Sequence, residues 1–335
     1  MARANYIRYY LEQAAETQAA RRALLKNSAI SLDKLSDPDY NVDLLQVRQV
    51  INNIKSRSHP LTAIQFGQAF SVKHLGLIGH AILSCDTLAD CTRYWNHFND
   101  LVGNVLNYPL LIKDDYCEIE FEELCPLGDS LPFCIEQSLA STLQVVMELT
   151  GESIRYQSIE LTYPANKSRL TEHHYRDFFG CDVIFNGRRN VATFLASDFD
   201  RKIHTADEET LTLLDQHCQD VLRKQKETGG IAQQVRQLFL KHSRNPPKIT
   251  EIASLFQTSE RSLRRKLDNE GLSYSGLRND FRRDLAIEYL KSTDLAAKEI
   301  AYLLGYDNIS SFRRAFKEQT GETVKVFRNK LKAQP

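Results

Sequence analysis

The chain has 335 residues, enough for two domains that each bury a hydrophobic core at about 150 residues per domain. Its composition, 42% hydrophobic and 26% charged residues with only 14 glycines and 9 prolines, excludes collagen-like, low-complexity and wholly disordered classes. The whole chain is neutral, but residues 229–335 hold 20 basic and 12 acidic residues, whereas the first 228 residues hold 23 and 31. This asymmetry indicates a polyanion as the partner of the basic part.

The sequence lacks the features of an exported or membrane protein. Its longest apolar stretch, residues 75–85, is shorter than a bilayer-spanning helix and is interrupted by glycines and a histidine. The N-terminus has no apolar signal-peptide core, and its acidic residues are unlike those of import peptides. The seven cysteines include no C-x-x-C pair. We therefore expect a cytosolic protein with reduced thiols.

The first 200 residues predict a domain that mixes helices and strands. Apolar side chains three and four residues apart predict a series of helices, and later segments alternate polar and apolar residues as strands do. The predicted helices are 4–26, 42–54, 61–70, 75–83, 87–106 and 134–150, and the predicted strands are 158–163, 181–185 and 191–196. The last two strands flank Asn186 and Gly187, residue types that suit the turn of a hairpin.

Three glutamates alternate with apolar residues at 117–122, which predicts a strand with one acidic and one apolar face. They are Glu118, Glu120 and Glu122. Such a face could hold a cation, but a solvated edge that resists aggregation is the simpler interpretation. His173 and His174 are adjacent, so they point to different faces, and no cysteine or carboxylate lies at ligand spacing. We expect no metal site.

Residues 205–228 predict one amphipathic helix, with acidic residues in its first turn and basic residues in its last, as the helix dipole favours. Its apolar stripe fits a seven-residue repeat over about two heptads. Two interpretations stay open: the helix packs on its own domain, or it forms the seam of a homodimer. The stripe consists of Leu211, Leu214, Cys218 and Val221. Gly229 and Gly230 end this helix, so we predict domains at 1–228 and 229–335.

The basic part contains the same pattern twice, at 249–271 and 297–321. Each copy predicts a short helix, a tight turn and a second helix. Matching apolar residues recur 48 positions apart before the turn and 49 after it, so the second turn has one extra residue. Gly305 can end a helix in the left-handed conformation, and the hydroxyl of Ser259 can cap the helix that follows it.

The second helix of each copy has an apolar face and a basic face. Leu263 and Leu267 are four residues apart, as are Phe312 and Phe316, so each pair can anchor its helix to a core. An α-helix fits the major groove of B-DNA, where arginine can bond bidentately to guanine. The pattern therefore predicts a pair of helix-turn-helix motifs. The predicted DNA-binding residues are Arg261, Arg264, Arg265 and Lys266 in the first copy and Ser310, Arg313, Arg314 and Lys317 in the second.

Residues 246–331 resemble the DNA-binding domain of AraC/XylS transcription regulators. The matching motifs are S-x-R-x-L-x-R-x-[FL] at 259–267 and IA-x-x-LGY-x-[DN]-x-S-x-F-x-RAFK-x-x-TG at 300–321. The family commonly closes with S-P-x-x-[YF]-R, whereas this chain has TVKVFR at 323–328, which keeps the aromatic residue and the arginine. Residues 1–228 resemble the arabinose-binding-type effector domain of the ornithine-utilisation branch, through GLIGHAILSCDTLADC and YRDFFGCDVIFN.

This resemblance implies an α+β N-terminal effector domain followed by an all-α C-terminal domain with two helix-turn-helix motifs. It implies a sequence-specific regulator of transcription that binds double-stranded DNA and a small-molecule effector, with activation through RNA polymerase as the commoner outcome. It does not identify the effector. We expect no catalytic residues and no cofactor.

An enzyme and a nucleic-acid-binding protein without an effector are the two alternative functions. An enzyme is disfavoured because the sequence has no G-x-S-x-G motif and no phosphate-binding P-loop. A nucleoid or RNA-binding protein without an effector is the other alternative. The basic part has neither an aromatic-studded sheet nor an arginine-rich tail of the kind that single-stranded RNA recognition uses. Binding to duplex DNA of defined and of scrambled sequence would separate a regulator from a nucleoid protein, since a protein that binds only the DNA backbone does not distinguish the two duplexes.

Overall fold

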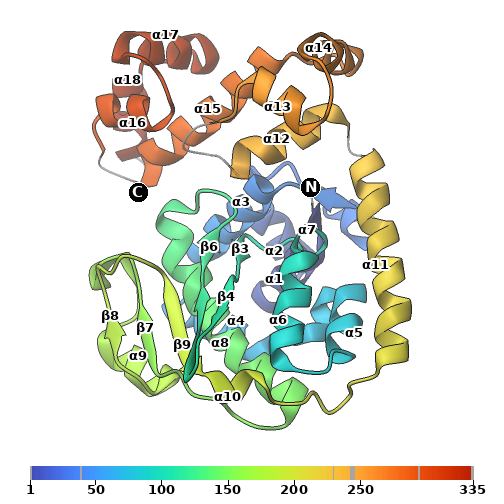
Figure 1. The fold of residues 1–335 in the computed structure, drawn as a ribbon. Helices are drawn as coiled ribbons and strands as arrows, with labels where there is room; N and C mark the ends of the chain where they lie inside the picture. The colour runs from blue at the N-terminus through green and yellow to red at the C-terminus, as the bar shows by residue number, and fades with distance from the viewer. Residues whose placement is uncertain (1, 38–39, 229, 242–245, 293–294, 333–335) are drawn as a thin grey trace. The chain divides into compact units, whose positions relative to one another are not determined.

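The computed structural model describes residues 2–37, 40–228, 230–241, 246–292 and 295–332 (Figure 1). The chain folds as two compact units, an N-terminal unit of residues 1–224 and a C-terminal unit of residues 225–335. Among the described residues, the N-terminal unit mixes helices with strands and the C-terminal unit contains helices alone. The predicted order of an α+β domain and an all-α domain is confirmed. Gly229 lies outside the described residues, and the boundary drawn there stays a prediction.

The helices of the N-terminal unit are mostly short, and α8 and α11 are the two long ones in the part described. The helices are α1 (Asn5–Ala14), α2 (Gln18–Leu24), α3 (Leu44–Lys55), α4 (Thr62–Ala69), α5 (Leu77–Leu83), α6 (Leu88–His97), α7 (Asn99–Val102), α8 (Leu131–Thr150), α9 (Glu172–Phe179), α10 (Ala196–Phe199) and α11 (Glu208–Thr228). Short 3₁₀ turns lie at Asp33–Ser36, Val72–Leu75, Gly128–Ser130 and Ala165–Lys167.

Two of the predicted helices are each divided in the structure. Residues 4–26 form α1 and α2, because Ala15 is extended and the Thr17 hydroxyl caps α2 by accepting a hydrogen bond from the Ala20 amide at 3.2 Å. Residues 87–106 form α6 and α7, and Gly103 then ends α7 with a left-handed φ of +82°. The cap at Thr17 therefore overrides the continuous apolar spacing in the first segment, whereas α6 and α7 meet at Phe98, which has no side-chain cap.

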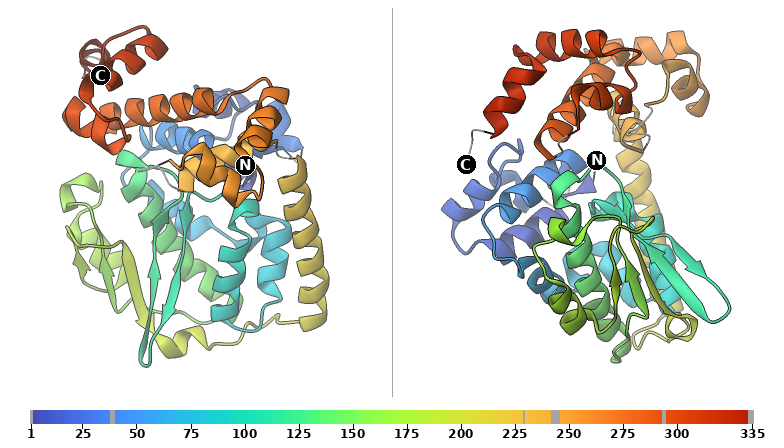
Figure 2. Two further views of the ribbon diagram at one scale, coloured as in Figure 1. Left: turned by 45° about the horizontal axis from the view of Figure 1, so that its top comes forward. Right: turned by 90° about the vertical axis from the view of Figure 1, so that its left-hand side faces the viewer.

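The strands are β1 (Ala2–Arg3), β2 (Asn41–Val42), β3 (Leu106–Asn107), β4 (Leu110–Ile112), β5 (Tyr116–Glu120), β6 (Glu122–Glu123), β7 (Ser158–Glu160), β8 (Val183–Ile184) and β9 (Val191–Leu195). β1 pairs with β2 and β3 with β6, while the main sheet has the order β4-β5-β9-β7-β8. Figure 2 shows the β4–β5 hairpin at one edge of this sheet. In β5, Cys117 and Ile119 are buried while Glu118 and Glu120 are half-buried, as the alternation predicts. The predicted strand is shorter than expected, because β5 ends at Glu120 and Glu122 lies in β6, paired with β3.

The predicted hairpin of 181–185 and 191–196 is wrong, because β7 lies between β8 and β9. β9 pairs antiparallel with β7, and β8 pairs parallel with the other side of β7. Asn186 does turn the chain, with φ of +57°. The N–H of the next residue, Gly187, however, donates a 2.8 Å hydrogen bond to the carbonyl of Leu161, which directly follows β7, and not to β9.

Helices α4 and α8 pack closely at Gly67. A Cβ added there would lie 2.4 Å from the Cβ of Ala140 and 2.5 Å from the carbonyl oxygen of Gln137. A larger residue would therefore push α8 away from α4. This close approach fixes the position of α8, which also forms one wall of the cavity described below.

The segment predicted as a helix at 205–228 is α11, whose first turn is capped by Asp207 through a 2.7 Å hydrogen bond from the Thr210 amide. The predicted stripe faces its own unit, since Cys218 is fully buried, whereas Leu213 is 63% exposed. The other members of the stripe, Leu211, Leu214 and Val221, are half-buried. In the structure α11 therefore packs on its own unit, which is one of the two interpretations of this helix. Its role as the seam of a homodimer stays a prediction.

The C-terminal unit is built around one long helix, α15. Its helices are α12 (Ile231–Lys241), α13 (Ile249–Leu255), α14 (Glu260–Asn269), α15 (Tyr274–Ser292), α16 (Ala297–Leu303), α17 (Ile309–Thr320) and α18 (Val324–Lys332). A single cluster of buried apolar residues includes members of every one of these helices. Figure 1 shows α15 running between the α13–α14 pair and the α16–α17 pair. No helix in the described ranges is long and apolar enough to span a bilayer.

Candidate DNA-binding interface

The turns of the two predicted helix-turn-helix motifs have the same hydrogen bonds. The Thr258 amide donates to the Ala253 carbonyl at 2.9 Å, and the Tyr306 amide donates to the Ala301 carbonyl at 2.9 Å. The left-handed residue before each of these amides is Gln257 in the first turn, with φ of +49°, and the predicted Gly305 in the second, with φ of +68°. The sequence repeat is therefore a repeat of backbone conformation as well.

The second helix of each motif begins at a side-chain cap. The Ser259 hydroxyl accepts a hydrogen bond from the Ser262 amide at 3.2 Å, as predicted, and Asn308 Oδ1 accepts one from the Ser311 amide at 2.8 Å. The additional residue of the second turn is Asp307, which precedes the Asn308 cap. Each cap fixes the residue at which its helix begins. The starting residue in turn determines the direction in which the basic side chains point around the helix axis.

In the first motif, α14 is anchored by Leu263 and Leu267, which are both fully buried. Successive helical residues are rotated by about 100°, so Arg261 and Arg265 lie on the side opposite to this apolar pair. Both are exposed, as are Arg264 and Lys266 on the flanks. The structure gives neither Arg261 nor Arg265 an ion-pair partner within its described residues, whereas Arg264 pairs with Glu260 at 2.7 Å.

In the second motif, α17 is anchored by Phe312 and Phe316, whose ring centroids lie 5.9 Å apart in the core. The same rotation places Ser310, Arg314 and Lys317 on the opposite side and Arg313 on a flank. All four are exposed. The structure thus brings the predicted residues of each copy together on one outward surface, while their role in binding DNA stays a prediction.

Arg282 of α15 holds the turn of the second motif. Its guanidinium donates a 2.7 Å hydrogen bond to the Gly305 carbonyl and lies 4.5 Å from the centroid of the Tyr306 ring. Burial lowers the pKa of Arg282, with the nearby Arg278 adding to the effect. This contact ties the second turn to the central helix through a side chain that the sequence analysis did not identify.

A second basic surface lies between α17 and α18. A hollow of about 740 Å³ is lined there by side chains that include Arg313, Lys317, Lys325 and Asn329. Lys325 and Asn329 were missed because the prediction considered only the second helix of each motif. Lys325 occupies the segment in which the chain departs from the usual S-P pattern, and its side chain is exposed. Lys330 on the same helix is also exposed, but it pairs with Glu322. The charge pattern after the second motif was the signal that could have identified it.

Residues 19–203, more than half of the chain, match the arabinose-binding domain of AraC transcription regulators, and residues 252–330 match a helix-turn-helix domain. The chain belongs to the AraC family of transcription regulators. This AraC-family protein is a DNA-binding transcription regulator with an N-terminal ligand-binding domain, as the resemblance implied.

Its relatives are regulators and not enzymes. The ornithine utilization regulator of Pseudomonas aeruginosa is 27% identical over 324 residues, which cover 96% of this chain and 95% of the relative. The transcriptional activator FapR of Escherichia coli is 36% identical over 80 residues, 24% of this chain and 31% of that protein. The crystal structure of the transcriptional regulator CdpR from Pseudomonas aeruginosa covers 94% of this chain and 99% of its own, with 20% identity and a TM-score of 0.46.

The glutamates considered as a cation site have protein partners. Glu118 pairs with Arg189 at 3.1 Å and with Lys113 at 3.3 Å, and Glu120 lies 3.7 Å from Arg189. Within the part of the chain that the structure describes, no group of three histidine, cysteine, aspartate or glutamate side chains is placed to hold a metal ion. The acidic face of β5 is therefore a charge-paired surface.

Proposed function

We propose that this AraC-family regulator reads one asymmetric DNA site with α14 and α17, and that a small molecule bound by its N-terminal domain controls activation of transcription. The observation that supports the reading of DNA is the equivalence of Arg265 and Arg314. Each is exposed on the helix side opposite to a buried apolar pair, and both helices belong to one core.

The length of the central helix fits two adjacent major grooves. α15 has 19 residues, which at about 1.5 Å per residue gives about 28 Å. Successive major grooves on one face of B-DNA lie about 34 Å apart. A helix of this length between the two motifs supports simultaneous entry of α14 and α17, with each reading its own half of an asymmetric site.

The positions of the basic residues divide their proposed roles. Base edges are read by Arg261 and Arg265 of α14 and by Ser310 and Arg314 of α17, which lie opposite the buried anchors. The flanking Arg264, Lys266 and Arg313, together with Lys317 beside the α17–α18 hollow, contact phosphates and set the register. The ion pair of Arg264 with Glu260 supports this division, because a paired arginine is less available for a bidentate contact with guanine.

The test is a titration of the full-length protein with a duplex selected from a random library and with a scrambled duplex, at fixed salt. Arg265→Ala should cost about 1–3 kcal/mol on the selected site and relax the base preference there. Arg176→Ala, an exposed arginine of the N-terminal unit, removes the same charge and should leave the affinity unchanged. Equal wild-type affinity for both duplexes would instead indicate a backbone binder of the nucleoid type.

Activation and effector control are the finer parts of the proposal. The name of the FapR relative supports activation, and the arabinose-binding-type domain supports a small-molecule effector acting on a cytoplasmic complex with DNA and RNA polymerase. A reporter gene behind the selected site tests both parts. Expression should depend on the protein and should change when its effector is supplied, by a coupling of about 1–3 kcal/mol. Constitutive expression that no metabolite extract alters would contradict effector control.

A further inference from the structure

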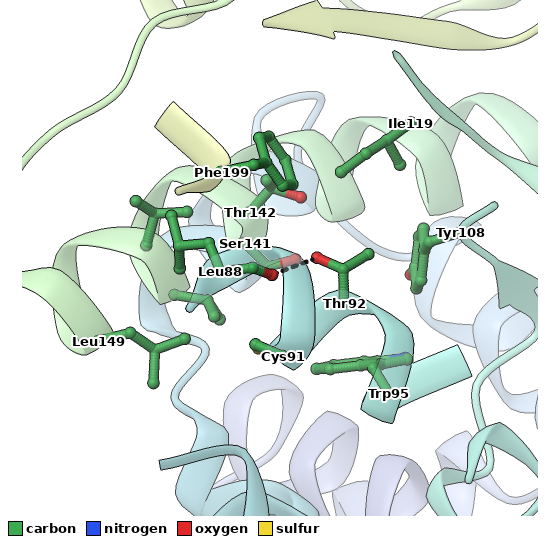
Figure 3. Close-up of a pocket in the computed structure, with 12 residues that line it drawn as sticks. Leu88, Cys91, Thr92, Trp95, Tyr108, Ile119, Ser141, Thr142, Leu149 and Phe199 are labelled. Carbon is green, nitrogen blue, oxygen red and sulfur yellow. Dashed lines mark hydrogen bonds between the residues drawn. The ribbon is translucent and has the colours of Figure 1, made fainter. Parts of the chain in front are cut away.

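The N-terminal unit contains a cavity of about 80 Å³ between α6, α8, β5 and α10. A single water molecule needs about 10–15 Å³ of such space, so the cavity has room for a small organic molecule. Figure 3 shows the indole of Trp95 along one side of it, next to Thr92 and Tyr108, with Phe199 and Ile119 across from them. Most of the remaining wall is aliphatic.

The side chains that line this cavity are all uncharged, and Tyr108 and Cys91 are the two among them that could ionise. Burial raises the pKa of Tyr108 to about 12 and the pKa of Cys91 well above its usual range, so both remain protonated at neutral pH. A ligand that carries a full charge would therefore lose its hydration and meet no opposite charge from the wall.

The polar atoms of the wall offer a small and specific set of hydrogen bonds. The hydroxyl of Thr92 donates to the Leu88 carbonyl at 2.9 Å, and those of Ser141 and Thr142 donate to the Ser138 carbonyl at 3.0 and 2.9 Å. With their protons committed to the helix backbone, the oxygens of Thr92 and Ser141 are left as acceptors. Trp95 also lines the cavity, and its buried indole N–H is a donor that has no acceptor within the described residues.

We propose that this cavity is the effector site of the N-terminal domain, and that its ligand is a neutral, mainly apolar small molecule with one group that both donates and accepts a hydrogen bond. A primary amide or an alcohol on an aromatic or aliphatic body has this chemistry. A zwitterionic amino acid does not, because its charges would be unpaired, and a sugar carries more hydroxyl groups than this wall can satisfy. The inference rests on the proposed effector control, whose ligand it specifies.

Helix α6 connects the cavity to α11, the helix at which the N-terminal unit ends. Thr92 and Trp95 face the cavity, whereas His97 Nε2 lies 3.2 Å from Gln219 Nε2 of α11. Tyr94 of α6 also adjoins α11, where its hydroxyl lies beside Cys218; burial raises the pKa of Tyr94, and this neighbour adds to the effect. A ligand that shifts α6 would therefore act directly on α11, the segment that continues into the C-terminal unit.

Trp95 is the single tryptophan of the chain, so its fluorescence reports on the cavity in the full-length protein without DNA. The probes are benzamide and its charged analogues benzoate and benzylamine, which share one ring and differ in the head group. Benzamide should change the Trp95 emission saturably, and the two charged analogues should bind at least about tenfold more weakly. L-Arabinose and L-ornithine should produce no saturable change. A saturable response to either of them with none to benzamide, or no response to any probe, would overturn the proposal.

Two substitutions of α8 locate the response. Val145→Phe fills the cavity and should abolish the benzamide response, whereas Leu143→Phe changes the other side of the same helix, where a separate hollow lies, and should retain it. Equal responses in the two variants would place benzamide elsewhere. Thr92→Val keeps the shape of the wall and removes one acceptor. It should therefore weaken the binding of benzamide several-fold and leave the binding of toluene, which forms no hydrogen bond, unchanged. This comparison also decides the question if Val145→Phe does not fold.

The binding measurement is independent of the proposed function. A benzamide response at Trp95 with unchanged operator binding and reporter output would retain the ligand site and contradict effector control. Loss of the fluorescence response with intact effector control of the reporter would contradict this site alone.

Discussion

Gln257 and Gly305 occupy the same position in the two helix-turn-helix turns, with φ of +49° and +68°. The left-handed conformation is unstrained for glycine and costs other residues roughly 1–2 kcal/mol. In addition, a Cβ at Gly305 would lie 3.2 Å from the guanidinium of Arg282. The two turns therefore have the same backbone but different tolerance for a side chain.

We predict opposite effects when the two residues are exchanged. Gly305→Gln should lower the free energy of unfolding of the C-terminal unit by about 1–2 kcal/mol, because it adds strain at a position held by Arg282. Gln257→Gly should raise it by up to about 1 kcal/mol, with part of the gain offset by the greater entropy of the unfolded chain. Denaturant unfolding of the full-length protein measures both changes. If Gly305→Gln instead raised the free energy of unfolding, a side chain at this position would not strain the turn.

Lys325 is predicted to contact a phosphate. Lys325→Ala should weaken binding to selected and scrambled duplexes alike, and it should reduce the slope of log affinity against log salt by about 1. Lys330→Ala is the matched control on the same helix, since Lys330 is paired with Glu322 and should contribute less. If Lys325→Ala changed the preferred sequence while leaving the salt dependence unchanged, Lys325 would be a base contact.

The extent to which sequence predicted structure depended on the range of the interactions involved. The two motifs were identified because their signals are local: the cap of Ser259, the turn at Gly305 and each pair of apolar residues four apart depend only on residues of a single motif. The β8–β9 hairpin failed because β7, which is distant in sequence, takes the place between them. No sequence pattern marked the α6–α8 cavity, since its walls come from segments that only the fold brings together.

The same reasoning applies to single residues of the candidate interface. Arg265 and Arg314 were predicted because they lie in repeated motifs with known helical spacing. Arg282 was not, because its contact with Tyr306 joins the middle of one helix to the turn that follows another. Sequence periodicity gives the face of a helix on which a residue lies, whereas the partner across the core depends on how the helices pack.

The two faces of α11 predict different outcomes for neighbouring substitutions. Leu214 is half-buried against its own unit, so Leu214→Asp should destabilise the N-terminal unit by about 1–3 kcal/mol in thermal unfolding. Leu213 is 63% exposed, so Leu213→Asp should leave the melting temperature unchanged. If α11 also joins two protomers, Leu213→Asp should convert a dimer into a monomer in sedimentation. A wild-type protein that is monomeric at micromolar concentration would end the dimer prediction.

Glu136 predicts a pH dependence of stability that can be assigned to one buried carboxyl. It is buried in α8, where its Oε1 accepts hydrogen bonds from the Ser168 hydroxyl at 2.6 Å and the Tyr175 hydroxyl at 2.7 Å. Burial raises the pKa of Glu136 to about 7, although both hydroxyl donors oppose this shift by favouring the charged form. In the unfolded chain the carboxyl titrates near its ordinary value of 4.5.

The sign of the effect follows from proton binding. Between pH 4.5 and about 7 the folded protein holds a proton on Glu136 that the unfolded chain has released, so stability falls as the pH rises through this window and is constant above it. Glu136→Gln should therefore flatten the stability profile in this window and stabilise the protein above it by on the order of 2 kcal/mol. Tyr175→Phe removes one donor to the carboxylate and should shift the upper end of the window to higher pH. The free energy of unfolding measured from pH 5 to pH 8 tests both variants, and a profile of Glu136→Gln that follows the wild type would show that another group titrates.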